Sequence, residues 1–292
     1  MNPLHTLVQC RGNVKACLII LFVVKWAPIY YNRSIMTMTT KNIADIQLIV
    51  LAAGKGTRMN SDLPKVLTPL DGKPLVAHLL AHVDAVGFTK KPIIIAGHRA
   101  ELVQQALGPE YRYAMQSEQR GTGHAVKCAQ PLLLGKAEDI MVLYGDHPLI
   151  DAETIRTIGS AHLAGHKPLT MATVSVDDFS DWRNGFWHWG RIIRDDGGAI
   201  VRNVEFKDAT EAERAVTEVN PSFFCFKARW LWENLAKLTD HNHQKEYYLP
   251  DLIQAACESG GITDVAISPR TALGANTKEE LAVLEKILRE QS

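Results

Sequence analysis

Short apolar runs alternate with helical patterns from Ile46 onward, and this alternation limits the possible folds of the chain more than any other feature. The runs at 46–51 and 140–144 are almost continuously apolar, as expected for strands that are buried on both faces. Between them, apolar residues recur at helical spacing, as in 75–83. Buried strands that alternate with amphipathic helices predict a doubly wound α/β fold with a mostly parallel sheet.

A strand-rich stretch at 169–226 interrupts this alternation, and it predicts a β-rich extension of the sheet that forms a lid or a wall of the substrate site. No internal repeat, low-complexity tract or proline-rich linker is visible within 46–292, so one domain is expected there. The remaining expected strands are 93–96 and 111–115, and the remaining expected helices are 100–107, 151–164, 230–238, 249–258 and 278–290.

The first 45 residues differ from the rest of the chain because they contain a nine-residue apolar run, 16–24, with basic residues on both sides. The run is shorter than the roughly 20 apolar residues of a membrane-spanning helix. No small-residue cleavage site follows it, as one would in a signal peptide. We expect 1–45 to lie outside the fold, as a disordered leader or as a segment that is not made if translation starts at Met36 or Met38.

The composition argues against several classes of partner. Lys plus Arg and Asp plus Glu both number 32, so the chain has no overall basic field to attract nucleic acid. The five cysteines show no CxxC spacing, which argues against a disulfide framework or a zinc site. A reducing compartment, the cytoplasm, is therefore expected, with neither nucleic acid nor a membrane as partner; the sequence indicates no oligomeric state.

A glycine-rich turn follows the first predicted strand. It reads LAAGKGTRM over 51–59, and a Pro-Lys pair follows at 64–65. Glycines at the carboxyl end of a strand let a ligand approach the backbone, whose N–H groups can bind phosphate oxygens. Lys55, Arg58 and Lys65 add positive charge that suits a triphosphate. The turn lacks the third glycine of a dinucleotide fingerprint and the Gly-Lys-Ser/Thr of a Walker loop, so we predict a different kind of phosphate site.

Asp146 follows the predicted strand 140–144 and is the best candidate for a metal ligand. A carboxylate at the end of a central strand faces the ligand crevice of an open α/β sheet. Mg²⁺ prefers oxygen ligands and usually takes only one or two from the protein, which Asp146 fits. The alternative is that Asp146 only stabilises a turn or caps a helix. His147 beside it is expected to pack against its neighbours or to support the site, rather than to bind the metal or to act as a catalytic residue.

These motifs resemble those of the sugar-1-phosphate nucleotidyltransferases, and most of all the N-acetylglucosamine-1-phosphate uridylyltransferase branch. The resemblance extends, with interruptions, from about 48 to 284. It implies a Rossmann-like nucleotidyltransferase fold that uses Mg²⁺ to convert UTP and N-acetylglucosamine 1-phosphate into UDP-N-acetylglucosamine and pyrophosphate. The motifs are LAAGKGTRMNSDLPKVL at 51–67, QSEQRGTGHA at 116–125, WGRI at 189–192, VEFKDA at 204–209 and LGANT at 273–277.

The resemblance also implies roles for individual residues. It assigns the metal to Asp146 and Asn276, although Asn276 could instead cap the last helix. It makes Arg58, Lys65 and Asp146 catalytic through neutralisation of phosphate charge. The implied uracil contacts are Gln116, Gly121 and Thr122, and the implied sugar contacts are Gly190, Glu205 and Asn220. The full predicted substrate-binding set is Leu51, Ala52, Ala53, Gly54, Gly56, Lys65, Gln116, Gly121, Thr122, Tyr144, Gly145, Gly190, Glu205, Asn220 and Asn276.

Two departures from the family pattern lie on the sugar side. Asn220 is followed by Pro221-Ser222 where the family has Thr-Gly, and 184–189 is unusually aromatic. They leave open a uridylyl- or thymidylyltransferase for glucose, N-acetylmuramic acid or glucosamine 1-phosphate, although VEFKDA argues against glucose. A non-catalytic nucleotide-sugar sensor is the remaining alternative. The hexapeptide repeats of the bifunctional relatives are not seen, so no left-handed β-helix domain and no acetyl transfer are expected.

Overall fold

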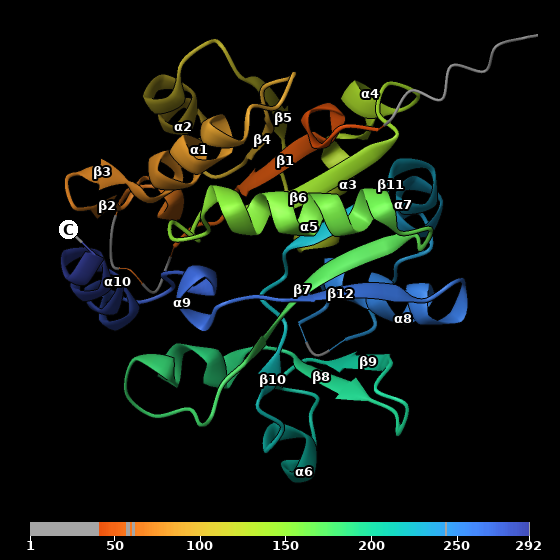
Figure 1. The fold of residues 1–292 in the computed structure, drawn as a ribbon. Helices are drawn as coiled ribbons and strands as arrows, with labels where there is room; N and C mark the ends of the chain where they lie inside the picture. The colour runs from red at the N-terminus through yellow and green to blue at the C-terminus, as the bar shows by residue number, and fades with distance from the viewer. Residues whose placement is uncertain (1–40, 57–58, 60–61, 243, 292) are drawn as a thin grey trace, which may run out of the picture. The chain divides into compact units, whose positions relative to one another are not determined.

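The computed structural model describes residues 41–56, 59, 62–242 and 244–291, and a ten-stranded mixed sheet forms its centre (Figure 1). The strand order is β5-β4-β1-β6-β11-β7-β10-β8-β9, with β12 beside β7. The strands are β1 (Gln47–Ala52), β4 (Ile93–Ala96), β5 (Arg112–Met115), β6 (Asp139–Tyr144), β7 (Leu169–Ser175), β8 (Arg191–Arg194), β9 (Ile200–Val204), β10 (Glu218–Val219), β11 (Phe224–Lys227) and β12 (Ile262–Ala266). A separate hairpin is formed by β2 (Pro69–Leu70) and β3 (Lys73–Pro74).

Strand direction divides the sheet. β5, β4, β1 and β6 are parallel neighbours, so their carboxyl ends lie along one edge. β11 runs antiparallel between β6 and β7, and β10, β8 and β9 continue as an antiparallel extension. The parallel half confirms the predicted doubly wound fold, and the antiparallel half corresponds to the β-rich extension expected at 169–226.

Helices cover both faces of the sheet. Residues Leu48 and Val50 of β1 belong to one core cluster, whereas Ile49 and Leu51 belong to another. This two-sided burial is the reason that β1 reads as a continuous apolar run. The first core packs mainly against α1 (Leu75–Val86), α2 (Ala100–Leu107), α5 (Ala152–Ala164) and α10 (Lys278–Gln291), and Figure 1 shows α5 in front of β6. The second packs mainly against α3 (Thr122–Cys128), α4 (Gln130–Leu133), α7 (Ala228–Leu235) and α8 (Leu252–Glu258).

Short elements complete the chain. The 3₁₀ turns are η1 (Ile43–Asp45), η3 (Lys65–Leu67), η4 (Asp181–His188) and η5 (Leu249–Asp251), and the short helices are α6 (Glu211–Arg214) and α9 (Pro269–Ala272). The aromatic stretch 184–189, for which no element was expected, lies mostly in η4. The helix expected at 249–258 differs from the prediction because it begins with η5, which contains Pro250. Proline lacks the N–H that an interior helical position would donate.

Two strand assignments also differ from the prediction. The strand-rich stretch includes the run VNPSFFCF at 219–226, which by its apolar character is expected to form one strand, but it is divided between β10 and β11 with a turn at 220–223. Pro221 cannot donate to a ladder, and Ser222 has a positive φ of 62°, so the pairing is interrupted there. β12 was not predicted, because only its first residue is buried and the alternation of apolar side chains is weak.

The packed structure begins before the expected boundary at residue 46. Ile43 lies in η1 and packs against the core, and a Cβ on Gly159 of α5 would lie 3.1 Å from its side chain. The rest of the predicted leader, 1–40, lies outside the described residues. Within the described part of the chain, no helix has the length and apolar character needed to span a bilayer.

Candidate active site

The site forms where the carboxyl ends of β1 and β6 meet. The two strands are parallel neighbours, and the Gly145 N–H donates to the carbonyl of Leu51 across them at 2.9 Å. A Cβ on Gly145 would lie 2.9 Å from Val66 and 3.1 Å from that carbonyl oxygen, so glycine allows this close approach. η3 then sets Lys65 above the strand ends, anchored by buried Val66.

Three predicted residues from distant parts of the chain converge at this point. The Lys65 ammonium forms an ion pair with the Asp146 carboxylate and donates to Asn276 Oδ1 at 2.6 Å. The side chains of Lys65 and Asp146 are only 13% and 15% exposed. The Ala275 N–H donates to the backbone carbonyl of Asp146 at 3.1 Å, which ties the late loop to the end of β6. Asp146 and Asn276 thus direct oxygens at one ammonium group, and the shared metal that the resemblance implies for them stays a prediction.

Asn276 does not cap the last helix. The Thr277 hydroxyl accepts from the Glu280 N–H at 3.2 Å, and the Glu280 carboxylate accepts from the Thr277 N–H at 3.2 Å. These reciprocal hydrogen bonds cap α10, and the Glu280 carboxylate also accepts from the Asn276 N–H. The Asn276 side chain is therefore free to face Lys65, and the capping alternative raised by the sequence is excluded.

The electrostatics favour a charged Asp146. Burial raises the pKa of this carboxyl, but several opposing interactions, the largest with the Lys65 ammonium, together hold the pKa below its ordinary value. His147 next to it is buried, and burial lowers its pKa. Its ring meets Tyr144, Trp189 and Phe223 edge-on at 5.1–5.9 Å between centroids. These contacts agree with the packing role expected for His147.

A cavity of about 300 Å³ lies on one side of Lys65 and Asp146. Gln116 is buried beside it, and its amide donates to the Gly121 carbonyl at 2.9 Å. Two polar lining residues had no predicted role: Gln119, whose amide donates to the Ala53 carbonyl at 2.8 Å, and Glu246. The predicted substrate residues that line this cavity are Leu51, Ala53, Gly54, Lys65, Gln116, Gly121, Thr122 and Tyr144.

The segment 246–249 supports the loop that carries Gly121. Gly121 has φ of 97°, and a Cβ there would lie 2.6 Å from the Tyr247 carbonyl oxygen. The Tyr247 N–H donates to the Arg120 carbonyl at 2.9 Å, and the Leu249 N–H donates to the Thr122 hydroxyl at 2.9 Å. No role was predicted for 246–251, although its sequence EYYLPD resembles the EYYxTD of the family.

A larger cavity of about 860 Å³ lies on the other side of the same cluster. Lys65, Tyr144 and Asp146 line both cavities, so the two meet at the predicted catalytic residues. The predicted sugar residues Gly190, Glu205 and Asn220 line the larger one, together with Asn276. Lining residues without a predicted role include His188, Asp208, Gln244, Tyr248 and Glu280.

Side-chain amides hold the sugar-side wall in place. The Asn220 amide donates to Asn203 Oδ1 at 3.3 Å, and the Asn203 amide donates to Glu205 Oε1 at 3.0 Å. A Cβ on Gly190 would lie 2.6 Å from Asn203 Oδ1, so a larger residue would displace Asn203 from this chain of amides. Burial is the main reason that the pKa of Glu205 is raised.

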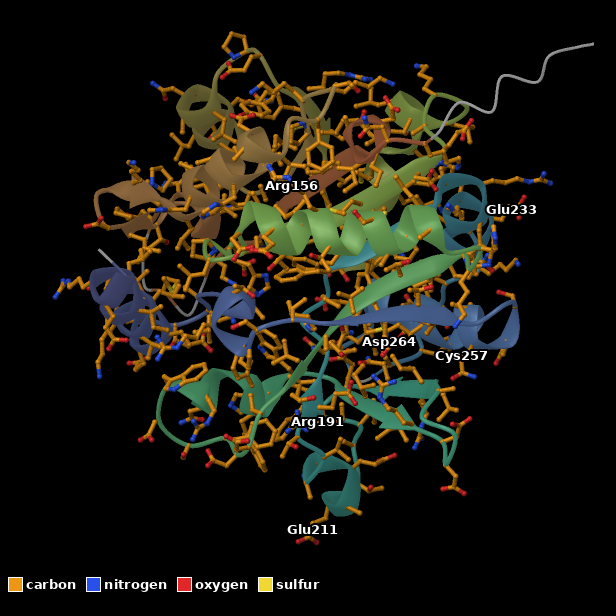
Figure 2. The ribbon with its side chains drawn as sticks, viewed as in Figure 1. Arg156, Arg191, Glu211, Glu233, Cys257 and Asp264 are labelled. Atoms are coloured by element: carbon orange, nitrogen blue, oxygen red, sulfur yellow. The ribbon has the colours of Figure 1, made fainter. Side chains whose placement is uncertain are left out.

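Arg191, labelled in Figure 2, fixes the turn that carries Gly190. It is fully buried, and its guanidinium donates to the Trp187 carbonyl at 2.9 Å and to the Trp189 carbonyl. The same group lies 4.7 Å from the centre of the Phe179 ring and 5.7 Å from that of Phe206. Within the aromatic stretch 184–189, the Trp187 ring centre lies 5.5 Å from this guanidinium, whereas Trp189 packs against His147 and Phe186.

The remaining predicted residues are not among those that line either cavity. Ala52 is buried within β1, and Gly56 packs against Lys65, whose Cβ would be 3.0 Å from a Cβ at that position. Gly145 lies behind Asp146, as described above. Arg58 falls outside the described residues, so its catalytic role stays a prediction.

The donor set fits a hard cation. Asp146 and Asn276 supply two oxygens that already converge on one positive charge. Among the residues that the structure describes, no group of three or more His, Cys, Asp or Glu side chains is placed to hold a metal. A site with one carboxylate and one amide oxygen suits Mg²⁺, which takes its other ligands from phosphates and water.

Comparison with known proteins identifies the family of the chain. Residues 48–252 match the family model described as "MobA-like NTP transferase domain". The bifunctional protein GlmU of an Exiguobacterium species is 40% identical over 246 residues, 84% of this chain and 53% of that protein. The GlmU of Enterococcus faecalis is 42% identical over 242 residues, which are 82% of this chain and 51% of that protein. The chain thus spans about half the length of these relatives, and it belongs to the MobA-like NTP transferase domain family.

Proposed function

We propose that this chain transfers a uridylyl group from UTP to N-acetylglucosamine 1-phosphate, with release of pyrophosphate. One observation carries the proposal: Lys65, Asp146 and Asn276 meet where two cavities join. A transferase that joins two phosphorylated substrates needs its charge-neutralising groups at such a junction. The similarity to the bifunctional GlmU proteins supports the same reaction.

In the proposed reaction, a phosphate oxygen of the sugar 1-phosphate attacks the α-phosphorus of UTP. A new P–O bond forms as the bond between the α-phosphorus and the bridging oxygen breaks, and pyrophosphate leaves with the electron pair. The attacking phosphate is already ionised at neutral pH, because the second pKa of a phosphate monoester is about 6. The site therefore needs no general base, and it acts through positioning and charge neutralisation.

Each group at the junction has a part in this scheme. Asp146 and Asn276 would hold Mg²⁺, which when bound draws negative charge from the phosphates of both substrates. Lys65 lies at the same point and would bind a phosphate oxygen once the substrates arrive. Arg58 is proposed, from the sequence alone, to offset charge on the departing pyrophosphate.

The two cavities suit the two substrates. In the smaller one, the Gln116 amide and the backbone of Gly121 offer donors and acceptors that match the edge of uracil. In the larger one, Glu205 and Asn220 can accept from and donate to sugar hydroxyls. Carboxylates of Asp208 and Glu280 also line the larger cavity, and they argue against an acidic sugar such as N-acetylmuramic acid 1-phosphate.

A pyrophosphate-release assay tests this function. The purified chain would be given UTP or dTTP with Mg²⁺ and each of N-acetylglucosamine, glucosamine, glucose and N-acetylmuramic acid 1-phosphates. We expect the highest kcat/KM for UTP with N-acetylglucosamine 1-phosphate, and loss of release when EDTA is added. A preference for another sugar would replace the substrate assignment, and binding without turnover of any pair would favour a sensor.

We also infer a cytoplasmic location. Cys128, Cys225 and Cys257 are free thiols, as expected in a reducing compartment. Burial raises the pKa of each of these thiols, so they stay protonated and unreactive. Fractionation of cells that express the full chain, with the soluble and membrane fractions probed separately, would test this location.

A further inference from the structure

Ser222 has an unusual backbone conformation for its residue type. It lies in the turn between β10 and β11 with φ of 62°, in the left-handed region that favours glycine. Among the described residues, four other non-glycine residues have positive φ, and all four are exposed: Asp71, Arg99, Asp181 and Lys245. Ser222 is partly buried and lines the larger cavity. The family motif noted above has glycine here, so the serine accepts strain that a glycine would avoid.

The turn around Ser222 is held on both sides. Its N–H donates to the Asn220 side-chain oxygen at 2.8 Å, and the Asn220 N–H donates to the Gly190 carbonyl at 2.9 Å. The next residue, Phe223, is fully buried, and its carbonyl accepts from the Ala172 N–H at 3.0 Å. This support keeps the left-handed conformation in place and fixes where the serine side chain lies.

The hydroxyl of Ser222 lies beside the junction of the two cavities. Tyr144 lines both cavities, and the side chains of Thr122 and Ser222 are hydrogen-bonding neighbours of its hydroxyl. The hydroxyls of Thr122, Tyr144 and Ser222 thus extend from the loop that carries Gly121 to the wall of the larger cavity. A serine hydroxyl both donates and accepts hydrogen bonds, whereas a glycine would present only backbone atoms at this point of the cavity wall.

We propose that the Ser222 hydroxyl binds a polar ring substituent of the sugar 1-phosphate and contributes to the choice of sugar. The inference rests on the proposed function and deepens it, because it assigns part of the sugar preference to a residue without a predicted role. Backbone strain of this kind is typical of residues at ligand sites, and Ser222 combines it with a place in a cavity wall.

Three variants separate the hydroxyl from the strain. Ser222→Gly removes both, Ser222→Ala removes the hydroxyl but keeps the Cβ, and Asp71→Gly is the matched control. Asp71 also has positive φ, of 48°, but it is exposed in the β2–β3 turn and lines neither cavity. KM for the sugar 1-phosphate, KM for UTP and the melting temperature would be measured for each, and binding of the sugar 1-phosphate would be followed by calorimetry.

We expect Ser222→Ala and Ser222→Gly to raise KM for N-acetylglucosamine 1-phosphate roughly 3- to 10-fold, the loss of one uncharged hydrogen bond, with KM for UTP unchanged. Ser222→Gly and Asp71→Gly should raise the melting temperature by roughly 2–4 °C, whereas Ser222→Ala should not. An unchanged sugar KM in Ser222→Ala, or an equal rise in both KM values, would overturn the inference. Absence of turnover and of sugar binding in the wild type would instead refute the proposed function, and the inference with it.

Discussion

Replacement of Asp146 by asparagine tests the central cluster most directly. The change keeps the shape of the side chain and removes its charge. In the wild type, the Asp146 carboxylate pairs with Lys65, and both side chains are at least 85% buried. The variant leaves the Lys65 ammonium with neutral oxygens only, from the new Asn and from Asn276 at 2.6 Å.

The expected loss of stability follows from this geometry. Removal of one partner from a buried ion pair typically destabilises a protein by about 3–5 kcal/mol. Because Asn276 Oδ1 still accepts from the ammonium, we expect a smaller value, about 2 kcal/mol, for the free energy of unfolding. For a chain of this size that corresponds to a drop in melting temperature of roughly 4–8 °C. The effect on turnover should be much larger, roughly 10²- to 10³-fold, because the charged ligand of the proposed metal site is lost.

A double-mutant cycle isolates the pair. Denaturant unfolding of the wild type, Asp146→Asn, Lys65→Met and the double variant gives the coupling energy between the two side chains. Pyrophosphate release by the same four proteins gives the effect on catalysis, and calorimetric titration with Mn²⁺ shows whether the metal site survives. We expect coupling of about 2 kcal/mol and weakened Mn²⁺ binding in Asp146→Asn.

Two outcomes would refute this reasoning. Coupling below about 0.5 kcal/mol would mean that Lys65 and Asp146 do not form a buried pair. Turnover of Asp146→Asn within about tenfold of the wild type would mean that Asp146 is not the charged ligand on which charge neutralisation depends. Either result would remove the basis for placing the reaction at the junction of the two cavities.

Two further predictions concern other parts of the molecule. Gly190→Ala should raise KM for the sugar 1-phosphate at least tenfold in the release assay with little change for UTP, because a Cβ would lie 2.6 Å from Asn203 Oδ1; an unchanged sugar KM would contradict this. Asp139→Asn should destabilise the fold by about 2–3 kcal/mol at neutral pH, since the carboxylate accepts from His162 at 3.1 Å and from Lys227 at 2.8 Å. Burial raises the pKa of Asp139, but these donors lower it overall, so the stabilisation is present above the ordinary pKa of 3.8 and is lost as the pH falls. Urea unfolding between pH 7 and 3 should therefore show that the difference in unfolding free energy between wild type and Asp139→Asn becomes smaller below about pH 4. A difference that grows in acid would contradict this prediction.

Local patterns were sufficient to predict the parallel half of the sheet. β4 and α2 have the expected bounds, and β1, β6 and α5 differ from the predicted ranges by about one residue. These elements bury apolar side chains at regular spacing, so their periodicity is visible in the sequence. The prediction was wrong where that signal is weak: β12 has one buried residue, and the turn after β10 depends on the strained backbone of Ser222.

The sequence by itself determined the chemical character of the site. Glycines after a buried strand, three basic residues near them and an aspartate after the central strand indicate phosphate and metal chemistry without any coordinates. Those features are local, because a strand end and the turn that follows it are set by neighbouring residues. The family resemblance added Asn276, which local pattern alone could equally have assigned to a helix cap.

Only the tertiary structure decided which of these groups act together. Lys65 and Asn276 are 211 positions apart, and their contact depends on the parallel pairing of β1 with β6 and on the capping of α10 by Thr277 and Glu280. The supporting role of 246–249 and the amide chain behind Gly190 depend on long-range packing in the same way. Such contacts leave no periodic trace in a sequence, because the free energy that selects them comes from the packing of the whole sheet and its helices.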